Sequence, residues 1–220
     1  MVEVIDDKRN KQAHVSPAPL IDGCGRRIDS LRLSVTSACD LKCIYCRPER
    51  ERDADGTGGT LSDAQRVEFV RFLHEQYGLS QVRVTGGEPL VYGKVVSLIA
   101  SLRQTVPDIT IAMTTNGQRL YQKGFDLRQA GLDRLNVSLD SIDPDRYHQL
   151  TGSSLEGVLR GLKSARFVGF DAPKINTVVL RGMNDAELPT IAEWAMTQGS
   201  EIRFLEAMPI GPAADINRRL

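Results

Sequence analysis

The chain has 220 residues, of which 41% are hydrophobic and 25% are charged, a composition that is ordinary for a globular protein with a substantial core. Lys and Arg together number 28, as do Asp and Glu, so no overall field favours nucleic acid or an acidic membrane, and any anion site must be built locally. No run approaches the roughly 18 apolar residues of a membrane span, and the N-terminus lacks the apolar stretch of a secretory signal, so we expect a cytoplasmic protein without a membrane or nucleic-acid partner.

Two segments differ in their patterning. Residues 1–28 are polar, broken by prolines and glycines, and without period; we interpret them as an N-terminal tail or crossing segment, and residues 29–220 as one core domain. Residues 31–36, LRLSVT, alternate apolar and polar side chains and predict a strand. A capping-box pattern at Ser62 and Gln65 precedes apolar residues at helical spacing and predicts a helix over 62–77.

The same alternation of strand and helix continues to the end of the core domain. Further strands are predicted at 81–85, 109–114, 134–139, 174–179 and 201–206. Helices are predicted at 95–106, 119–130 and 185–198, and helical segments between 144 and 168. Six strands separated by helices indicate an α/β fold with a parallel sheet.

One face of this sheet is predicted to be polar, although buried parallel strands usually read as nearly continuous apolar runs. The polar positions on the strands and at their ends are Arg32, Ser34, Thr36, Arg83, Thr85, Thr110, Thr114, Asn136, Ser138, Asp140, Lys174 and Asn176. If helices cover the apolar face, these residues line a cavity. A partial (β/α)6 TIM-like barrel with a wet interior therefore fits better than a flat doubly wound sheet. The alternative is that some of them face solvent on edge strands.

The loop after the first core strand holds three of the four cysteines, Cys39, Cys43 and Cys46, spaced CxxxCxxC. In a reducing compartment, clustered cysteines are metal-binding or catalytic rather than disulfide-bonded. A 4Fe-4S cluster usually takes four cysteines, one per iron, so three would leave one iron open to a small-molecule ligand. Cys24 is expected to lie outside such a cluster.

A zinc site is the alternative use of the three thiols. A non-enzymatic, zinc-stabilised binding module would need a fourth ligand from His14, His74 or His148. None of these histidines lies at zinc-finger spacing from the cysteines.

A glycine pair follows the second core strand, in the sequence TGGEP at 85–89. Adjacent glycines at a strand end allow backbone conformations closed to other residues and let a ligand approach the main chain. Alone this is a weak signal, but it stands beside the cysteine loop of the neighbouring strand.

Together these motifs resemble the radical S-adenosylmethionine (SAM) superfamily, in which Tyr45 just before the last cysteine and the GGEP sequence are also typical. The segments GRRIDSLRLSVTSACDLKCIYC, VRVTGGEPL, MTTNG, LNVSLDS, KINTVVLRGMND and FLEAMPIG occur in this order. They look like the GTP 3',8-cyclase family, which performs the first step of molybdenum cofactor biosynthesis. The resemblance implies the partial barrel of radical SAM enzymes.

The resemblance also implies roles for matching residues. Three cysteines would hold a 4Fe-4S cluster whose open iron chelates the amino and carboxylate groups of SAM, namely Cys39, Cys43 and Cys46. Four residues match SAM contacts of the family, namely Tyr45, Gly87, Ser138 and Met208. Four residues match GTP contacts, namely Arg32, Arg83, Thr114 and Lys174. The GTP set lies on the predicted polar face and contains three cations, as a triphosphate requires.

The implied reaction begins with reductive cleavage of SAM to methionine and a 5'-deoxyadenosyl radical. That radical abstracts hydrogen from C3' of GTP, and the carbon radical attacks C8 of guanine, giving (8S)-3',8-cyclo-7,8-dihydroguanosine 5'-triphosphate. No side chain is assigned as an acid or base. The partners expected are GTP as substrate, a reductant or electron-donor protein, and a second copy of the chain in a homodimer.

The chain departs from this family in one respect. Family members continue into a region with a second three-cysteine cluster that contacts guanine, whereas this chain has no cysteine after Cys46. Two alternatives to the complete cyclase therefore stay open: a fragment of a longer protein, or a truncated or diverged radical SAM enzyme that acts on another substrate.

Overall fold

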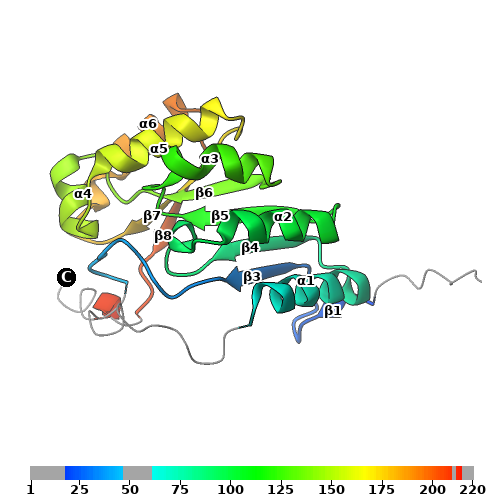
Figure 1. Cartoon of the computed structure of the whole chain (residues 1–220). Coiled ribbons are helices and arrows are strands. Elements are labelled where there is room, and N and C mark those ends of the chain that lie inside the picture. The colour runs from blue at the N-terminus through cyan, green and yellow to red at the C-terminus, as the bar shows by residue number, and fades with distance from the viewer. Residues whose placement is uncertain (1–17, 47–60, 210–211, 215–220) are drawn as a thin grey trace, which may run out of the picture.

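The structure is a computed structural model that describes residues 18–46, 61–209 and 212–214 (Figure 1). Six parallel strands form one sheet in the order of the chain, β3-β4-β5-β6-β7-β8. Their bounds are β3 Ser30–Ser34, β4 Gln81–Thr85, β5 Thr110–Thr115, β6 Arg134–Ser138, β7 Lys174–Val179 and β8 Ile202–Glu206. Within the described residues β3 and β8 each pair with a single strand of this sheet, so the barrel is open.

Helices connect the strands and gather on one side of the sheet (Figure 1). Their bounds are α1 Asp63–Tyr77, η2 Pro89–Val91, α2 Val95–Thr105, α3 Leu120–Gln129, α4 Pro144–Thr151, α5 Leu155–Phe167, η3 Asp185–Glu187 and α6 Leu188–Thr197. The predicted alternation of strands and helices and the partial TIM-like barrel are therefore confirmed. No helix in the described part of the chain combines the length and apolar character needed to cross a membrane.

The core lies between the sheet and these helices. Residues that alternate with the polar positions are almost fully buried, for example Val82 and Val84 on β4 and Ile111 and Met113 on β5. They pack against apolar side chains of the helices, such as Leu98 of α2. Each such side chain contributes roughly 1.5–3 kcal/mol through burial, so this face fixes which side of every strand points inward.

Local signals explain where the helices begin and end. The predicted capping box at the start of α1 is present, with Ser62 and Gln65 satisfying each other's backbone amides. The helical segments predicted between 144 and 168 are two helices. The first, α4, ends at Gly152, whose φ of 70° is left-handed, and Ser154 caps the start of α5. A left-handed glycine and a new N-cap leave no continuous helix through this point.

The N-terminal segment contains more order than the sequence predicts. Residues Leu20–Ile21 (β1) and Arg27–Ile28 (β2) form a two-stranded antiparallel pair. The turn between them is held by the Asp22 side chain, which accepts hydrogen bonds from the backbone amides of Cys24 and Arg26. Two-residue strands are too short to produce a period, which is why the sequence predicts no strand in this segment.

Candidate functional site: the cysteine loop and the polar face of the sheet

The cysteine loop leaves the C-terminal end of β3 and is held by backbone hydrogen bonds on two sides. On one side, the amide of Glu88 donates to Ala38 O at 2.8 Å. On the other side, the amides of Lys42 and Ile44 donate to carbonyl oxygens at the end of α4, at 2.9 and 3.0 Å. The loop is therefore built into the edge where the strands end, which is where active sites of parallel α/β barrels collect.

The glycine pair after β4 serves this packing. The amide of Gly87 donates to Thr36 O at 2.7 Å. A Cβ on Gly87 would overlap the carbonyl oxygen of Ala38 and lie 2.6 Å from that of Ser37. A Cβ on Gly86 would lie 2.5 Å from Thr36 O. The cysteine loop itself therefore comes close enough to this backbone to require glycine, in addition to any close approach by a ligand.

A buried carboxylate underlies the glycine pair. Glu88 is 1% exposed and accepts hydrogen bonds from the Thr115 hydroxyl at 2.6 Å, the Asn116 amide at 2.7 Å and the Leu90 amide at 2.9 Å. Burial raises the pKa of Glu88 to about 7, against the opposing effect of these donors. Glu88 therefore joins the end of β4 to the end of β5 as a structural group.

The same region of β5 reaches the cysteine loop through side chains. Asn116 donates from Nδ2 to Asp40 Oδ1 at 2.8 Å, and Arg119 forms an ion pair with Asp40 at 2.8 Å. Asp40 directly follows the first cysteine in sequence. The TTNG segment of β5 thus positions one end of the loop, a role that its sequence did not indicate.

The other end of the loop is tied to β6. The Tyr45 hydroxyl donates to Asp140 Oδ2 at 2.5 Å, and Asp140 also accepts from the Val178 amide at 2.8 Å. Burial raises the pKa of Asp140 to about 6, and burial beside this carboxyl raises the pKa of Tyr45. Asp140, predicted to face an open cavity, instead lies buried as the anchor of Tyr45.

An apolar pocket of about 530 Å³ lies beside this anchor. Its lining includes Tyr45, Cys46, Val178, Phe204 and Met208. The structure therefore brings together two of the predicted SAM contacts, Tyr45 and Met208, with one of the predicted cluster ligands. Met208 is 67% exposed, so its thioether is accessible to a ligand in this pocket.

The three cysteines lie on the loop that these contacts position. No disulfide joins them; Cys39 and Cys43 are partly buried and Cys46 is exposed. Burial, with the neighbouring charges of Asp140 and Cys46, raises the pKa of Cys43 to about 12, so a bound metal would have to displace its proton. Within the described residues no group of three or more His, Cys, Asp or Glu side chains could hold a metal ion. In a 4Fe-4S cluster each thiolate binds a different iron.

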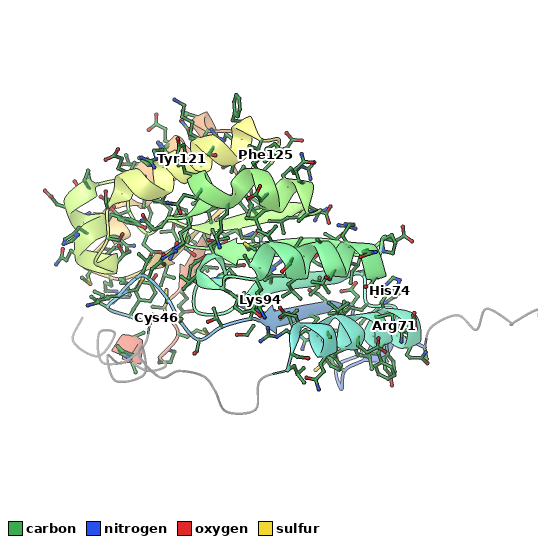
Figure 2. All side chains as sticks on the ribbon, viewed as in Figure 1. Cys46, Arg71, His74, Lys94, Tyr121 and Phe125 are labelled. Atoms are coloured by element: carbon green, nitrogen blue, oxygen red, sulfur yellow. The ribbon has the colours of Figure 1, made fainter. Side chains whose placement is uncertain are left out.

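The zinc alternative finds no support from the two histidines in the described part of the chain. His74 lies on α1, at the opposite end of the molecule from Cys46 (Figure 2), and its Nδ1 lies 2.8 Å from Leu79 O. His148 lies on α4 and lines a groove between α4 and α5. His14 falls outside the described residues.

The strand register confirms that the predicted polar positions share one face. Arg32 of β3 is opposite Arg83 of β4. Thr114 of β5 is opposite Asn136 of β6, which is opposite Lys174 of β7. Paired residues in parallel strands point to the same side, so all four predicted GTP contacts lie on the side away from the buried apolar residues. The predicted SAM contact Ser138 pairs with Asn176, two residues further along β6 and β7.

The register also reveals a cation that sequence reasoning missed. Arg203 of β8 is opposite Asn176. Burial, with the positive charges of Arg32 and Arg203, lowers the pKa of Arg83. Three guanidinium groups from β3, β4 and β8 therefore lie near one another on this face. The exposed carboxylate of Glu201 pairs with both Arg203, at 2.7 Å, and Lys174, at 2.6 Å.

The comparison with protein families decides where the chain belongs. The radical SAM superfamily matches residues 33–195. The chain belongs to the radical SAM superfamily. Radical SAM proteins use a 4Fe-4S cluster together with SAM. This membership accounts for the cysteine loop at the end of β3 and for the glycine pair that packs against it.

Curated relatives of this radical SAM chain include enzymes named GTP 3',8-cyclase. One from Paenarthrobacter nicotinovorans is 41% identical over 192 residues, which cover 87% of this chain and 54% of the relative. One from Petrotoga mobilis is 41% identical over 87% of this chain and 59% of the relative. GTP 3',8-cyclase 2 of Pseudomonas aeruginosa is 39% identical over 94% of this chain and 62% of the relative. The chain thus spans a little over half the length of these relatives.

Solved structures support the radical SAM fold. Streptococcus suis SuiB bound to precursor peptide SuiA has a TM-score of 0.69 at 18% identity, covering 82% of this chain and 40% of SuiB. Methylornithine synthase (PylB) has a TM-score of 0.63 at 18% identity, covering 82% of this chain and 53% of PylB. At this level of identity the likeness concerns the fold.

Proposed function

We propose that this chain holds a 4Fe-4S cluster on Cys39, Cys43 and Cys46 and takes part in the radical cyclisation of GTP. The product would be (8S)-3',8-cyclo-7,8-dihydroguanosine 5'-triphosphate, formed in the first step of molybdenum cofactor biosynthesis. When bound, the cluster supplies the electron that cleaves SAM and so generates the radical. The identity to several GTP 3',8-cyclases, 39–41% in the three described above, supports this proposal.

One observation carries the substrate assignment, namely the grouping of Arg32, Arg83 and Arg203. Burial, together with the like charges of Arg32 and Arg203, lowers the pKa of Arg83. Only one of the three arginines, Arg203, has a carboxylate within ion-pair distance among the described residues. The Nε of Arg83 is buried and has no partner in this part of the chain. A bound triphosphate would neutralise the repulsion and supply acceptors for these donors.

The pocket beside Cys46 suits the adenosyl half of SAM. Its apolar lining, including Phe204 and Met208, can pack against an adenine ring. Ser138 is half-buried at the end of β6 and presents a hydroxyl toward the polar face. In this proposal the side chains bind and orient the two nucleotides and exclude competing hydrogen donors, while no side chain transfers a proton.

The proposal includes an external electron source, either a reductant or an electron-donor protein. It also includes a cytoplasmic location, because free thiols that bind a cluster persist in a reducing compartment.

The test is an anaerobic incubation of the reconstituted chain with SAM, a reductant and GTP. 5'-Deoxyadenosine and the cyclised nucleotide are measured separately, and GTP affinity is measured by equilibrium dialysis. We expect both products, and we expect Arg83→Gln to weaken GTP binding about tenfold or more, because it removes a charged donor. Arg71→Gln is the matched control, since Arg71 lies at the far end of α1 (Figure 2) and pairs with Glu68 and Glu75.

The two products separate two levels of the proposal. Deoxyadenosine without cyclised nucleotide would contradict the cyclase assignment and leave the SAM chemistry standing. GTP affinity unchanged by Arg83→Gln would contradict the assignment of the arginine group to the triphosphate.

A further inference from the structure

Two asparagines on the polar face carry side-chain atoms without partners. Asn136 on β6 is 3% exposed, and its Nδ2 has no hydrogen-bond partner among the described residues. The Oδ1 of Asn176 on β7 is also buried and unpartnered in this part of the chain. Buried polar groups almost always have hydrogen-bond partners. Two unpartnered polar atoms on a face that already holds functional side chains therefore point to a ligand.

A third asparagine shows that this fold pairs buried carboxamides where they are structural. Asn184 is 0% exposed; its Oδ1 accepts from the Leu180 amide, and its Nδ2 donates to the carbonyl oxygens of Asp140 and Val178, all at 2.8 Å. Asn184 closes the connection after β7. The Nδ2 of Asn136 makes no comparable bond to any residue that the structure describes, so it has no evident structural role.

The positions of the two unpaired side chains limit where on the polar face a ligand would lie. Asn136 lies in register between Thr114 and Lys174, and Asn176 lies in register between Ser138 and Arg203. With strands about 4.8 Å apart and a rise of about 3.3 Å per residue, the Cα atoms of the two asparagines are about 8 Å apart. Arg32 and Arg83 are in register, through Ala112, with a position two residues before Asn136. The pair therefore lies between these two arginines and the strand ends where the cysteine loop begins, level with Lys174 and Arg203.

The hydrogen-bonding roles of the two unpaired atoms limit the chemical class of the ligand. One is a donor and the other is an acceptor. An ionised phosphate can only accept and an ammonium group can only donate, whereas a hydroxyl does both. A vicinal diol such as that of a ribose offers two hydroxyls and so satisfies both carboxamides at once.

We propose that Asn136 binds a ribose hydroxyl of the nucleotide substrate, with Asn176 accepting from the same diol. This inference rests on the proposed function, because it places the sugar of GTP between its phosphates at Arg32 and Arg83 and the SAM pocket at Cys46. SAM carries the same diol, and the test distinguishes these two sources. Asn136 is then a residue that makes the site specific for ribonucleotides.

The test compares ligand affinities of the anaerobically reconstituted wild-type chain and Asn136→Ala by equilibrium dialysis. The probes are GTP, 2'-deoxy-GTP, 3'-deoxy-GTP and SAM. We expect Asn136→Ala to weaken GTP binding about tenfold. We also expect wild type to bind one deoxy analogue about tenfold more weakly than GTP, and Asn136→Ala to bind that analogue and GTP equally. SAM affinity should not change.

Two controls distinguish the loss of a ligand contact from a general loss of stability. Asn136→Ala removes an unpaired group, so the midpoint of thermal unfolding should not fall. Thr177→Val changes a polar residue on the opposite face of β7, whose hydroxyl donates to Leu139 O at 2.7 Å; it should lower the midpoint and leave the ratio of GTP to deoxy-GTP affinity unchanged.

Each contrary outcome has a separate meaning. Wild type that binds GTP and an Asn136→Ala variant that binds it equally well would overturn this inference alone. Equal losses for GTP and both deoxy analogues would overturn the contact with a hydroxyl. A loss of SAM affinity in place of GTP affinity would assign the diol to SAM and overturn the substrate assignment of Asn136. Wild type that binds no GTP would overturn the proposed function together with this inference.

Discussion

Single side-chain hydrogen bonds between distant segments fix the cysteine loop. Asp40 and Tyr45 reach Asn116 and Asp140, which lie 76 and 95 residues away in sequence. The hydroxyl and carboxyl groups involved are paired in the interior, where a lost partner costs more than at the surface. The positions of the cysteines therefore depend on these distant partner residues as well as on the loop itself.

Removing one of these bonds should measurably weaken the fold. Tyr45→Phe removes the hydroxyl that donates to Asp140 and leaves the Val178 amide as the remaining donor to this carboxyl among the described residues. We expect the free energy of unfolding, measured with urea, to fall by about 1–3 kcal/mol. Tyr121→Phe is the control; Tyr121 is 56% exposed, and its change should stay within about 0.5 kcal/mol. Equal values for the two variants would show that the Tyr45 hydroxyl does not anchor the loop.

The buried Glu88 predicts a pH dependence with a defined sign. Its pKa is raised in the fold from 4.5 to about 7, so the folded state binds a proton more tightly than the unfolded state. The stability that this proton contributes is present below pH 4.5 and is lost as the pH rises to about 7. Relative to Glu88→Gln, which does not titrate, wild type should lose up to about 3 kcal/mol across this window.

Urea unfolding of both proteins at several pH values measures this difference in unfolding free energy. The contributions of all other titrating groups are common to both proteins and cancel in the difference. A difference that stays constant, or one in which wild type gains stability as the pH rises, would contradict the account of Glu88.

At the scale of elements, two loops meet at the C-terminal ends of β3 and β4 because one of them has no side chain at the contact. Gly87 lies against the backbone of Ser37 and Ala38. Its amide donates to Thr36 O, and the amide of Glu88 donates to Ala38 O. The GGEP segment thereby sets the path of the cysteine loop. A ligand that contacts both loops finds them already in place.

Adding one methyl group at this contact should displace the cysteine loop. In Gly87→Ala the Cβ would lie 2.6 Å from Ser37 O, so the backbone before Cys39 must move. We expect a loss of about 1–3 kcal/mol in unfolding free energy and a lower iron content after anaerobic reconstitution. Gly93→Ala, with no described atom within 4 Å of its Cβ, should retain both. Full iron content in Gly87→Ala would show that the close approach does not position the cysteines.

Periodicity predicted the main elements because long strands and helices repeat every 2 and about 3.6 residues, as in the alternation of β4 and the apolar stripe of α1. It missed β1 and β2, which have two residues each. It placed helical segments between 144 and 168 without giving the boundary between them, which Gly152 sets.

The candidate site was predictable where the sequence carries a dense local motif. The three cysteines and the glycine pair are of this kind. Arg203 and the partners Asn116 and Asp140 were missed as site residues because their roles depend on register and on contacts across the sheet. A single sequence contains the alternation that puts such residues on one face but not their neighbours on other strands.

At the scale of the whole molecule, the open sheet separates two surfaces of different chemistry. One face is covered by helices and carries the core, and the other carries cations, hydroxyls and carboxamides. The cysteine loop lies at the strand ends beside the polar face (Figure 2). A cofactor at the loop and a substrate on the polar face would therefore be neighbours.

The most direct test of this account is whether three thiols leave one iron open to SAM. The measurement is electron paramagnetic resonance of the dithionite-reduced, anaerobically reconstituted chain, recorded with and without SAM, alongside its metal content. The account predicts about four irons per chain and a cluster spectrum that shifts when SAM is added. A chain that holds one tight zinc and no iron, or a cluster spectrum that SAM leaves unchanged, would contradict it.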